Sequence, residues 1–239
     1  MQRSYSPGGL CAPRESVNRR CTRTIRGHEA LRGERSPATA HWPSEDIAVT
    51  THPDPELPAP LPVIASPRIP SGTRRELGLF GWLFCKLTAR VWGVPEFHLF
   101  TALAQHRRLF WSWIPFSGVL LYRGRLPKYD TEAVILRVGH LRGCAYELQQ
   151  HRRLALRRGL DEITQAEVFA WPSADGFSER MRALLTGVDE LVANRTLSDQ
   201  SWQLLSGYLD RRQVIEFVTL VGQYDALAMT LTTLGVPLD

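Results

Sequence analysis

Residues 144–151 have the sequence CAYELQQH, which places a thiol, a carboxylate and an imidazole at helical spacing. Side chains three and four positions apart lie on one face of an α-helix, so Cys144, Glu147 and His151 form a single stripe. A second carboxylate, Glu132, precedes them on what we expect to be the neighbouring helix. This segment therefore predicts a helical pair that carries chemically capable groups.

The remaining globular sequence also has a helical pattern, because caps and glycine stops are frequent and the alternation typical of strands is scarce. Residues 109–122 are expected to be buried and to bend at Pro115 and Gly118. Trp111, Trp113 and Phe116 are expected in the core or at a subunit interface, with a ligand cage as the alternative. We predict an all-α fold with helices from a cap at 71–73 to residue 94, and over 95–106, 109–122, 130–141, 144–158, 161–170, 178–193, 198–206 and 211–234.

Residues 1–70 differ from the remainder in composition. They are rich in Arg, Ser, Pro and Gly, which predicts a disordered or extended tail before a helical domain of residues 71–239. The Arg-rich start also resembles a transit peptide, although a tail without a targeting role or an upstream start codon is the plainer interpretation. Residues 1–35 hold eight Arg and three Glu, which leaves 21 basic and 21 acidic residues elsewhere. The globular part is therefore formally neutral, and no nucleic-acid partner is expected.

Cysteine usage and hydropathy bear on the compartment. The four cysteines, at positions 11, 21, 85 and 144, show neither zinc-site spacing nor a disulfide framework. The longest apolar runs are too short or too polar to cross a bilayer, and the N-terminus lacks the apolar core of a secretory signal. We therefore expect a cytoplasmic protein with no membrane partner.

The stripe on the helix after Gly143 offers two kinds of chemistry. Glu147 and His151 are spaced to share a hydrogen bond and to pass a proton near neutral pH. Cys144 would lie at a helix N-terminus, where the dipole favours the thiolate. The plainer alternative is a surface acid–base pair and a small core cysteine. Adding His140 does not complete a metal-binding pattern, so no metal is predicted.

A longer pattern surrounds this stripe. It consists of LP at 126–127, EAVILRV at 132–138, CAYE at 144–147, His151, Ala155 and GL at 159–160. The pattern resembles the signature of the carboxymuconolactone decarboxylase family, in the alkyl hydroperoxidase D-like superfamily. Residues 209–236 resemble the last helix of that family, so the resemblance covers about residues 95–239. It implies an alkyl hydroperoxidase D-like helical bundle that forms a homo-oligomer, a trimer or larger.

The resemblance also assigns roles to residues. In the hydroperoxidase branch a proton-relay glutamate precedes a Cys-x-x-Cys-x-x-x-His motif. Glu132, Cys144 and His151 match the relay, the first cysteine and the histidine, whereas Glu147 occupies the second cysteine position. Cys144 then lacks a partner for the local disulfide, unless Cys85 approaches from another helix, which weakens the peroxidase interpretation and favours the decarboxylase-like branch.

The predicted function is a cofactor-independent lyase that uses acid–base chemistry on a small carboxylated lactone or ring. Two alternatives stay open, a peroxiredoxin-type thiol-dependent peroxidase acting through Cys144 and a helical binding protein without catalysis. The predicted catalytic residues are Glu132, Cys144, Glu147 and His151. The predicted substrate-binding residues are Arg137, Arg142, Tyr146 and Tyr224. The arginines are expected to bind a substrate carboxylate, with a solvated helix face as the alternative.

Overall fold

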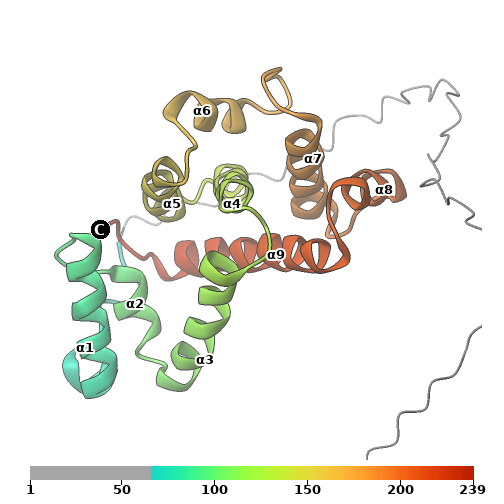
Figure 1. Cartoon of the computed structure of the whole chain (residues 1–239). Coiled ribbons are helices and arrows are strands. Elements are labelled where there is room, and N and C mark those ends of the chain that lie inside the picture. Colours follow the sequence, from blue (N-terminus) through green and yellow to red (C-terminus); the bar gives the residue numbers. More distant parts are fainter. Residues whose placement is uncertain (1–65) are drawn as a thin grey trace, which may run out of the picture. The chain divides into compact units, whose positions relative to one another are not determined.

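The computed structural model describes residues 66–239, and within that range the chain is helical and contains no strand (Figure 1). The predicted all-α fold is confirmed. Nearly all of the predicted tail, with Cys11 and Cys21, lies outside the described residues. The helices are α1 (Arg74–Trp92), α2 (His98–Leu103), α3 (Arg107–Gly118), the π-helical turn η1 (Val119–Arg123), α4 (Lys128–Arg142), α5 (Ala145–Arg157), α6 (Glu162–Ala170), α7 (Glu179–Asn194), α8 (Asp199–Tyr208) and α9 (Arg211–Leu234).

Helix α4 is the centre of the fold. It packs against α5, α6, α7 and α9, and most of its residues are buried whichever side they face (Figure 1). A helix that is buried on all sides must find partners for its polar groups, because an unpaired buried charge is costly. The charged residues Asp130, Glu132, Arg137 and Arg142 each have an ion-pair partner on a neighbouring segment.

The link between α4 and α5 fixes the position of the predicted site. Gly143 ends α4 with φ 63°, in the left-handed region that glycine adopts without steric cost. The backbone N–H of Cys144 then donates to the carbonyl of Gly139 at 2.9 Å, which closes the turn. Cys144 becomes the N-cap residue of α5, and Glu147 and His151 follow on the buried face of that helix.

Helices α1, α2 and α3 form a group on the other side of α9 from α4 (Figure 1). The expectation that residues 109–122 form one buried segment is wrong in part. Phe110 and Leu120 are buried, whereas Leu109, Phe116 and Val119 are exposed, because a single face of α3 packs on α1 and α2. The helix changes to π-helical geometry after Gly118, close to the predicted bend.

Helix α9 runs between the two groups and packs on α4, α7 and α8. Within residues 66–239 it is the helix that is long and apolar enough to span a membrane, judged by length and composition alone. Its apolar residues have a role within the fold, because Phe217, Leu220, Ala228 and Leu231 are buried in the main core. Tyr224, in the middle of the same helix, faces the cavity described next.

Candidate active site

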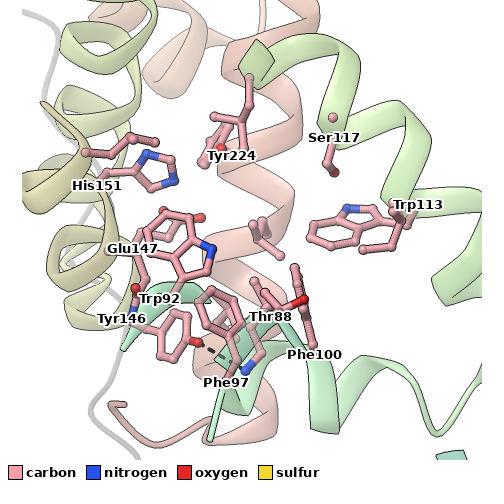
Figure 2. A pocket seen from close by; sticks show the side chains of 18 of the residues that line it. Thr88, Trp92, Phe97, Phe100, Trp113, Ser117, Tyr146, Glu147, His151 and Tyr224 are labelled. Atoms are coloured by element: carbon pink, nitrogen blue, oxygen red, sulfur yellow. Dashed lines mark hydrogen bonds between the residues drawn. The ribbon is translucent and has the colours of Figure 1, made fainter. Parts of the chain in front are cut away.

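A cavity of about 260 Å³ lies between the group α1–α3 and the helices α5 and α9 (Figure 2). Its walls come from α1, α2, α3, η1, α5 and α9. Aromatic rings dominate the side formed by α1, α2 and α3, with Trp92, Phe97, Phe100 and Trp113 facing the space. Ligand pockets commonly combine such apolar walls with a few polar groups that fix orientation.

Helix α5 supplies the largest set of polar groups in the cavity. Tyr146, Glu147, Gln150 and His151 all line it, so two residues of the predicted stripe, Glu147 and His151, face one space. Helix α9 adds Tyr224, whose ring meets the His151 ring edge to face at a centroid distance of 5.0 Å. The structure therefore brings four of the predicted residues, Tyr146, Glu147, His151 and Tyr224, to one cavity.

Glu132 lies behind His151 and holds it. His151 Nδ1 and Glu132 Oε2 are 2.9 Å apart, and Arg158 Nη1 donates to Glu132 Oε1 at 2.6 Å. A carboxylate that is paired with a guanidinium can only accept hydrogen bonds, so Nδ1 of the neutral imidazole must carry the proton. Nε2 is then the acceptor nitrogen, and Figure 2 shows the His151 ring facing the cavity. This arrangement presents a base to a ligand, oriented by a carboxylate.

Glu147 differs from Glu132 in having no hydrogen-bond partner for its carboxyl group among the described residues. Glu147 is also buried, with 2% of its surface exposed. Burial raises the pKa of this carboxyl well above its ordinary value of 4.5, and the nearby charge of Asp225 raises the pKa further. Both effects favour the protonated, uncharged form of the Glu147 carboxyl. The predicted hydrogen bond between Glu147 and His151 is not made, because His151 bonds to Glu132 instead.

Cys144 does not line the cavity, although the two residues that share its stripe do. Cys144 is 2% exposed. Burial, together with the nearby Glu147 carboxyl, raises the pKa of the Cys144 thiol to about 12. The expected helix-dipole stabilisation of the thiolate is therefore outweighed by desolvation. Cys85 is also a buried free thiol, and it belongs to a separate apolar cluster. Burial raises its pKa to about 11.

The arginines predicted to bind a substrate carboxylate lie away from the cavity. Arg137 forms a bidentate ion pair with Asp189, with N–O distances of 2.7 and 2.8 Å. Arg142 pairs with Asp225 and donates to the carbonyl of Val192 at 3.2 Å. Both guanidiniums are occupied by structural contacts, and neither is on the solvated face given as the alternative.

Tyr146 lines the cavity, and its hydroxyl is part of a second network. The hydroxyl accepts from the backbone N–H of Leu99 at 3.1 Å (Figure 2). It also donates to Asp239 Oδ2 at 2.9 Å. The same Asp239 side chain accepts from the backbone N–H of His98 at 2.9 Å and from the Gln150 amide at 3.0 Å. Asp239 thus joins α2 to α5 at one end of the cavity.

Sequence reasoning missed several of these residues. Arg158 lies seven positions after His151, so helical periodicity could have placed it near Glu132. Asp239 and His98 are 141 positions apart, and no spacing rule connects them. Trp113 packs against the core, as expected, and also lines the cavity, which was the alternative prediction, whereas Trp111 is exposed. No group of three potential metal ligands is present within residues 66–239, and His140 stacks on Phe169 outside the cavity.

A comparison with protein families matches residues 107–190 to the carboxymuconolactone decarboxylase family. This part of the chain is a carboxymuconolactone decarboxylase family domain. The match contains Glu132, Cys144, Glu147 and His151, and it is shorter than the resemblance over residues 95–239 seen in the sequence. Trp92 and Tyr224 lie outside the family match, so residues before and after the matched segment contribute to the cavity. No curated protein sequence matches the chain.

Solved structures with the same fold confirm the alkyl hydroperoxidase D-like architecture. An uncharacterized peroxidase-related protein from Ralstonia eutropha, with an alkylhydroperoxidase AhpD core, is 14% identical with a TM-score of 0.65 and covers 72% of this chain and 92% of that one. A peroxidase-related protein from Silicibacter is 13% identical with a TM-score of 0.61, covering 77% and 94%. The debrominase Bmp8, solved with 2,3,4-tribromopyrrole, is 13% identical with a TM-score of 0.60, covering 71% and 90%.

Proposed function

We propose that the cavity is an acid–base active site for a small, uncharged ring compound, with Glu147 as the acid and His151 as the base. The observation that carries this proposal is the Glu147 carboxyl, buried in the cavity wall without a charge or hydrogen-bond partner among the described residues. A carboxyl kept neutral at pH 7 by an apolar site can donate a proton or a hydrogen bond to a ligand oxygen. Such groups are characteristic of functional sites.

The two groups have opposite roles on one wall. His151 and Glu147 lie on consecutive turns of α5, so a ring between them can lose a proton to one and gain a proton from the other. His151 Nε2 would take a proton from a carbon beside a carbonyl, and the Glu147 O–H would protonate the carbonyl oxygen as the enol forms. Glu132 would stabilise the imidazolium that results, because its carboxylate is 2.9 Å from Nδ1. Return of both protons completes an isomerisation or exchange.

The lining favours an uncharged substrate. Among residues 66–239, no Lys or Arg lines the cavity, and Arg137 and Arg142 are held in ion pairs elsewhere. A carboxylated lactone would lose its solvation without gaining a cation, which is unfavourable in an apolar space. A neutral ring would instead contact Trp92, Phe97 and Trp113. The structural neighbour Bmp8, solved with a tribromopyrrole, supports a small aromatic ring as the kind of ligand this fold accepts.

A thiol-dependent peroxidase is the second candidate. The comparisons favour it over the decarboxylase prediction, because two of the similar structures are named as peroxidase-related. In that reaction the Cys144 thiolate would attack a peroxide oxygen, giving a sulfenic acid and an alcohol, and an external thiol would reduce the sulfenic acid. The position of Cys144 outside the cavity, with its pKa at about 12, weighs against this candidate.

Deuterium exchange tests the acid–base proposal. The purified protein is incubated in D2O with a panel of neutral cyclic ketones, and exchange beside the carbonyl is followed by NMR. We expect Glu147→Gln and His151→Asn to lower the enzyme-dependent exchange rate by about 100-fold or more. Glu162→Gln, at an exposed position of α6, is the matched control and should leave the rate unchanged. Exchange that survives in both site variants would contradict the proposal.

Thiol reactivity separates the two candidates. With a buried thiol of raised pKa, we expect Cys144 to react with iodoacetamide at pH 7.5 far more slowly than it does after unfolding in urea. Peptide mass spectrometry reports the labelling of Cys144 separately from the other cysteines. Rapid labelling of folded protein, together with peroxide consumption that is lost in Cys144→Ser, would establish the peroxidase instead.

A further inference from the structure

The polar atoms without partners are concentrated around the cavity. Among residues 66–239, the buried side-chain polar atoms that lack a hydrogen-bond partner belong to Ser117, Lys128, Glu147 and Gln150, and all of these residues except Lys128 line this space. Buried polar atoms in folded proteins are nearly always hydrogen-bonded. Their clustering therefore indicates the groups that a bound molecule must supply.

The neighbours of the Gln150 side-chain amide determine which of its two terminal atoms is the oxygen. The Gln150 amide nitrogen lies 3.0 Å from Asp239 Oδ2 and 3.2 Å from the Gln149 side-chain oxygen. Both neighbours accept hydrogen bonds, so the nitrogen must face them and the oxygen must be the atom left over. Gln150 thus presents an acceptor at the cavity wall, and a ligand must offer a hydroxyl or N–H there.

Glu147 presents the complementary group one turn earlier on α5. As a neutral acid it donates one O–H, which requires an oxygen acceptor on the ligand next to the donor that Gln150 requires. Ser117 lies across the cavity on α3, beside Trp113 (Figure 2). Its hydroxyl can donate to a further ligand oxygen at the opposite edge, and the described part of the chain places no Lys, Arg or paired carboxylate in the lining between them.

We infer that the substrate is an uncharged ring with two adjacent oxygen substituents at one edge, facing Glu147 and Gln150, and an oxygen acceptor at the opposite edge, facing Ser117. One adjacent substituent is a hydroxyl that donates to Gln150, and the other accepts from Glu147. This inference rests on the proposed function, because it uses Glu147 as an O–H donor. It adds Ser117 and Gln150 as the residues that determine specificity.

Calorimetric titration of the purified full-length chain with four matched compounds tests the inference. 3,4-Dihydroxyacetophenone has all three features, catechol lacks the distant oxygen, 4-hydroxyacetophenone lacks one adjacent hydroxyl, and 3,4-dihydroxybenzoate has a charge at the distant edge. We expect the ketone to bind most tightly, with the loss of one buried hydrogen bond costing about tenfold in Kd. The benzoate should bind most weakly, because its carboxylate finds no cation in the cavity.

Variants assign the contact to Ser117. Ser117→Ala should weaken binding of the ketone about tenfold and leave catechol unchanged, because catechol has no group opposite Ser117. Ser112→Ala is the control on the same helix, since Ser112 is exposed and its hydroxyl donates to the carbonyl of Arg108. Equal effects of Ser117→Ala on both compounds, no binding of the ketone, or binding of the benzoate at least as tight as the ketone would each overturn the inference.

Failure of the inference is distinguishable from failure of the proposed function. Glu147→Gln keeps a donor at the same place, so it should bind the ketone while it abolishes proton exchange. Binding with the expected Ser117 dependence, but without any exchange in the native protein, supports the inference and contradicts acid–base catalysis. Exchange in the native protein without Ser117 dependence of binding contradicts the inference alone.

Discussion

At the scale of single residues, two glutamates on adjacent helices differ because of their surroundings. Glu132 is fully buried but paired with His151 and Arg158, whereas Glu147 is buried without a partner among the described residues. A carboxyl in the first environment is held as an acceptor that orients the histidine, and one in the second is held as a neutral acid. The pair provides distinct acid and base functions from one residue type.

The raised pKa of Glu147 predicts a pH dependence of folding stability. The unfolded chain loses this proton near pH 4.5, whereas the folded chain keeps it to a higher pH. Raising the pH above 4.5 therefore stabilises the unfolded state, and the Glu147 contribution falls by up to about 1.4 kcal/mol per pH unit until the folded pKa is reached. Glu147→Gln should remove this slope, so urea denaturation should show a stability gain over native protein that grows from pH 5 to pH 7.5. Parallel pH profiles would contradict the assignment.

At the scale of elements, ion pairs fix how α4 contacts its neighbours. Arg137 is 1% exposed and joins α4 to α7 through Asp189, and it also donates to the carbonyls of Val168 and Phe169. A fully buried arginine of this kind has a structural role, since its donors are directed at groups within the protein. The Arg137 guanidinium is therefore held away from the cavity, although Arg137 lies in the segment that matches the family.

Removal of Arg137 should be strongly destabilising. Arg137→Met leaves Asp189 buried without its partner, so we expect a loss of about 3–5 kcal/mol in the free energy of unfolding. Arg153→Met is the control, because Arg153 is exposed on α5, and it should change stability by less than about 0.5 kcal/mol. Chemical denaturation compares the two variants. Equal stabilities would show that the pair contributes little.

Asp239 should stabilise the end of the cavity where α2 meets α5. Asp239→Ala leaves the Tyr146 hydroxyl, the Gln150 amide and the His98 backbone N–H without their acceptor. We expect a loss of about 1–3 kcal/mol in the free energy of unfolding. Asp175→Ala, in the exposed loop before α7, is the matched control. A thermal midpoint unchanged by Asp239→Ala would show that Asp239 does not stabilise this end of the cavity.

Much of the fold was predictable from sequence, and the site was predictable only in part. The break at Gly143 and the cap at Ser198 are local features of the backbone, so the sequence contains them directly. The shared orientation of Glu147 and His151 follows from helical periodicity. The contacts around them do not, because tertiary packing brings Glu132, itself paired with Arg158, to His151 and brings Asp239 to Tyr146 and Gln150. The position of Cys144 outside the cavity likewise depends on how α5 is rotated against α4 and α9.

At the scale of the whole molecule, the cavity needs helices from outside the family match. Helices α1, α2 and α9 supply Trp92, Phe97 and Tyr224, and α9 contributes much of the buried core around α4. The predicted homo-oligomer, cytoplasmic location and small-molecule partner stay predictions at this scale.

Truncation tests this dependence. A chain of residues 66–239 should unfold in one cooperative transition, because it keeps the core and the cavity intact. A chain of residues 107–190 should not fold, because α4 would expose to water the side that packs on α9. Circular dichroism during urea titration separates the two outcomes. A cooperative transition in the shorter chain would show that the family match is an independent folding unit.

We propose that Glu147 is a neutral acid facing the cavity, and infrared difference spectroscopy measures the protonation state of its carboxyl group directly. The spectrum of native protein minus that of Glu147→Gln at pH 7 should contain the carbonyl stretch of a protonated carboxyl group, shifted in D2O. Binding of 3,4-dihydroxyacetophenone should shift the band further, because the ligand bonds to that carboxyl. A difference spectrum that contains carboxylate bands in place of the protonated carboxyl band would contradict the account.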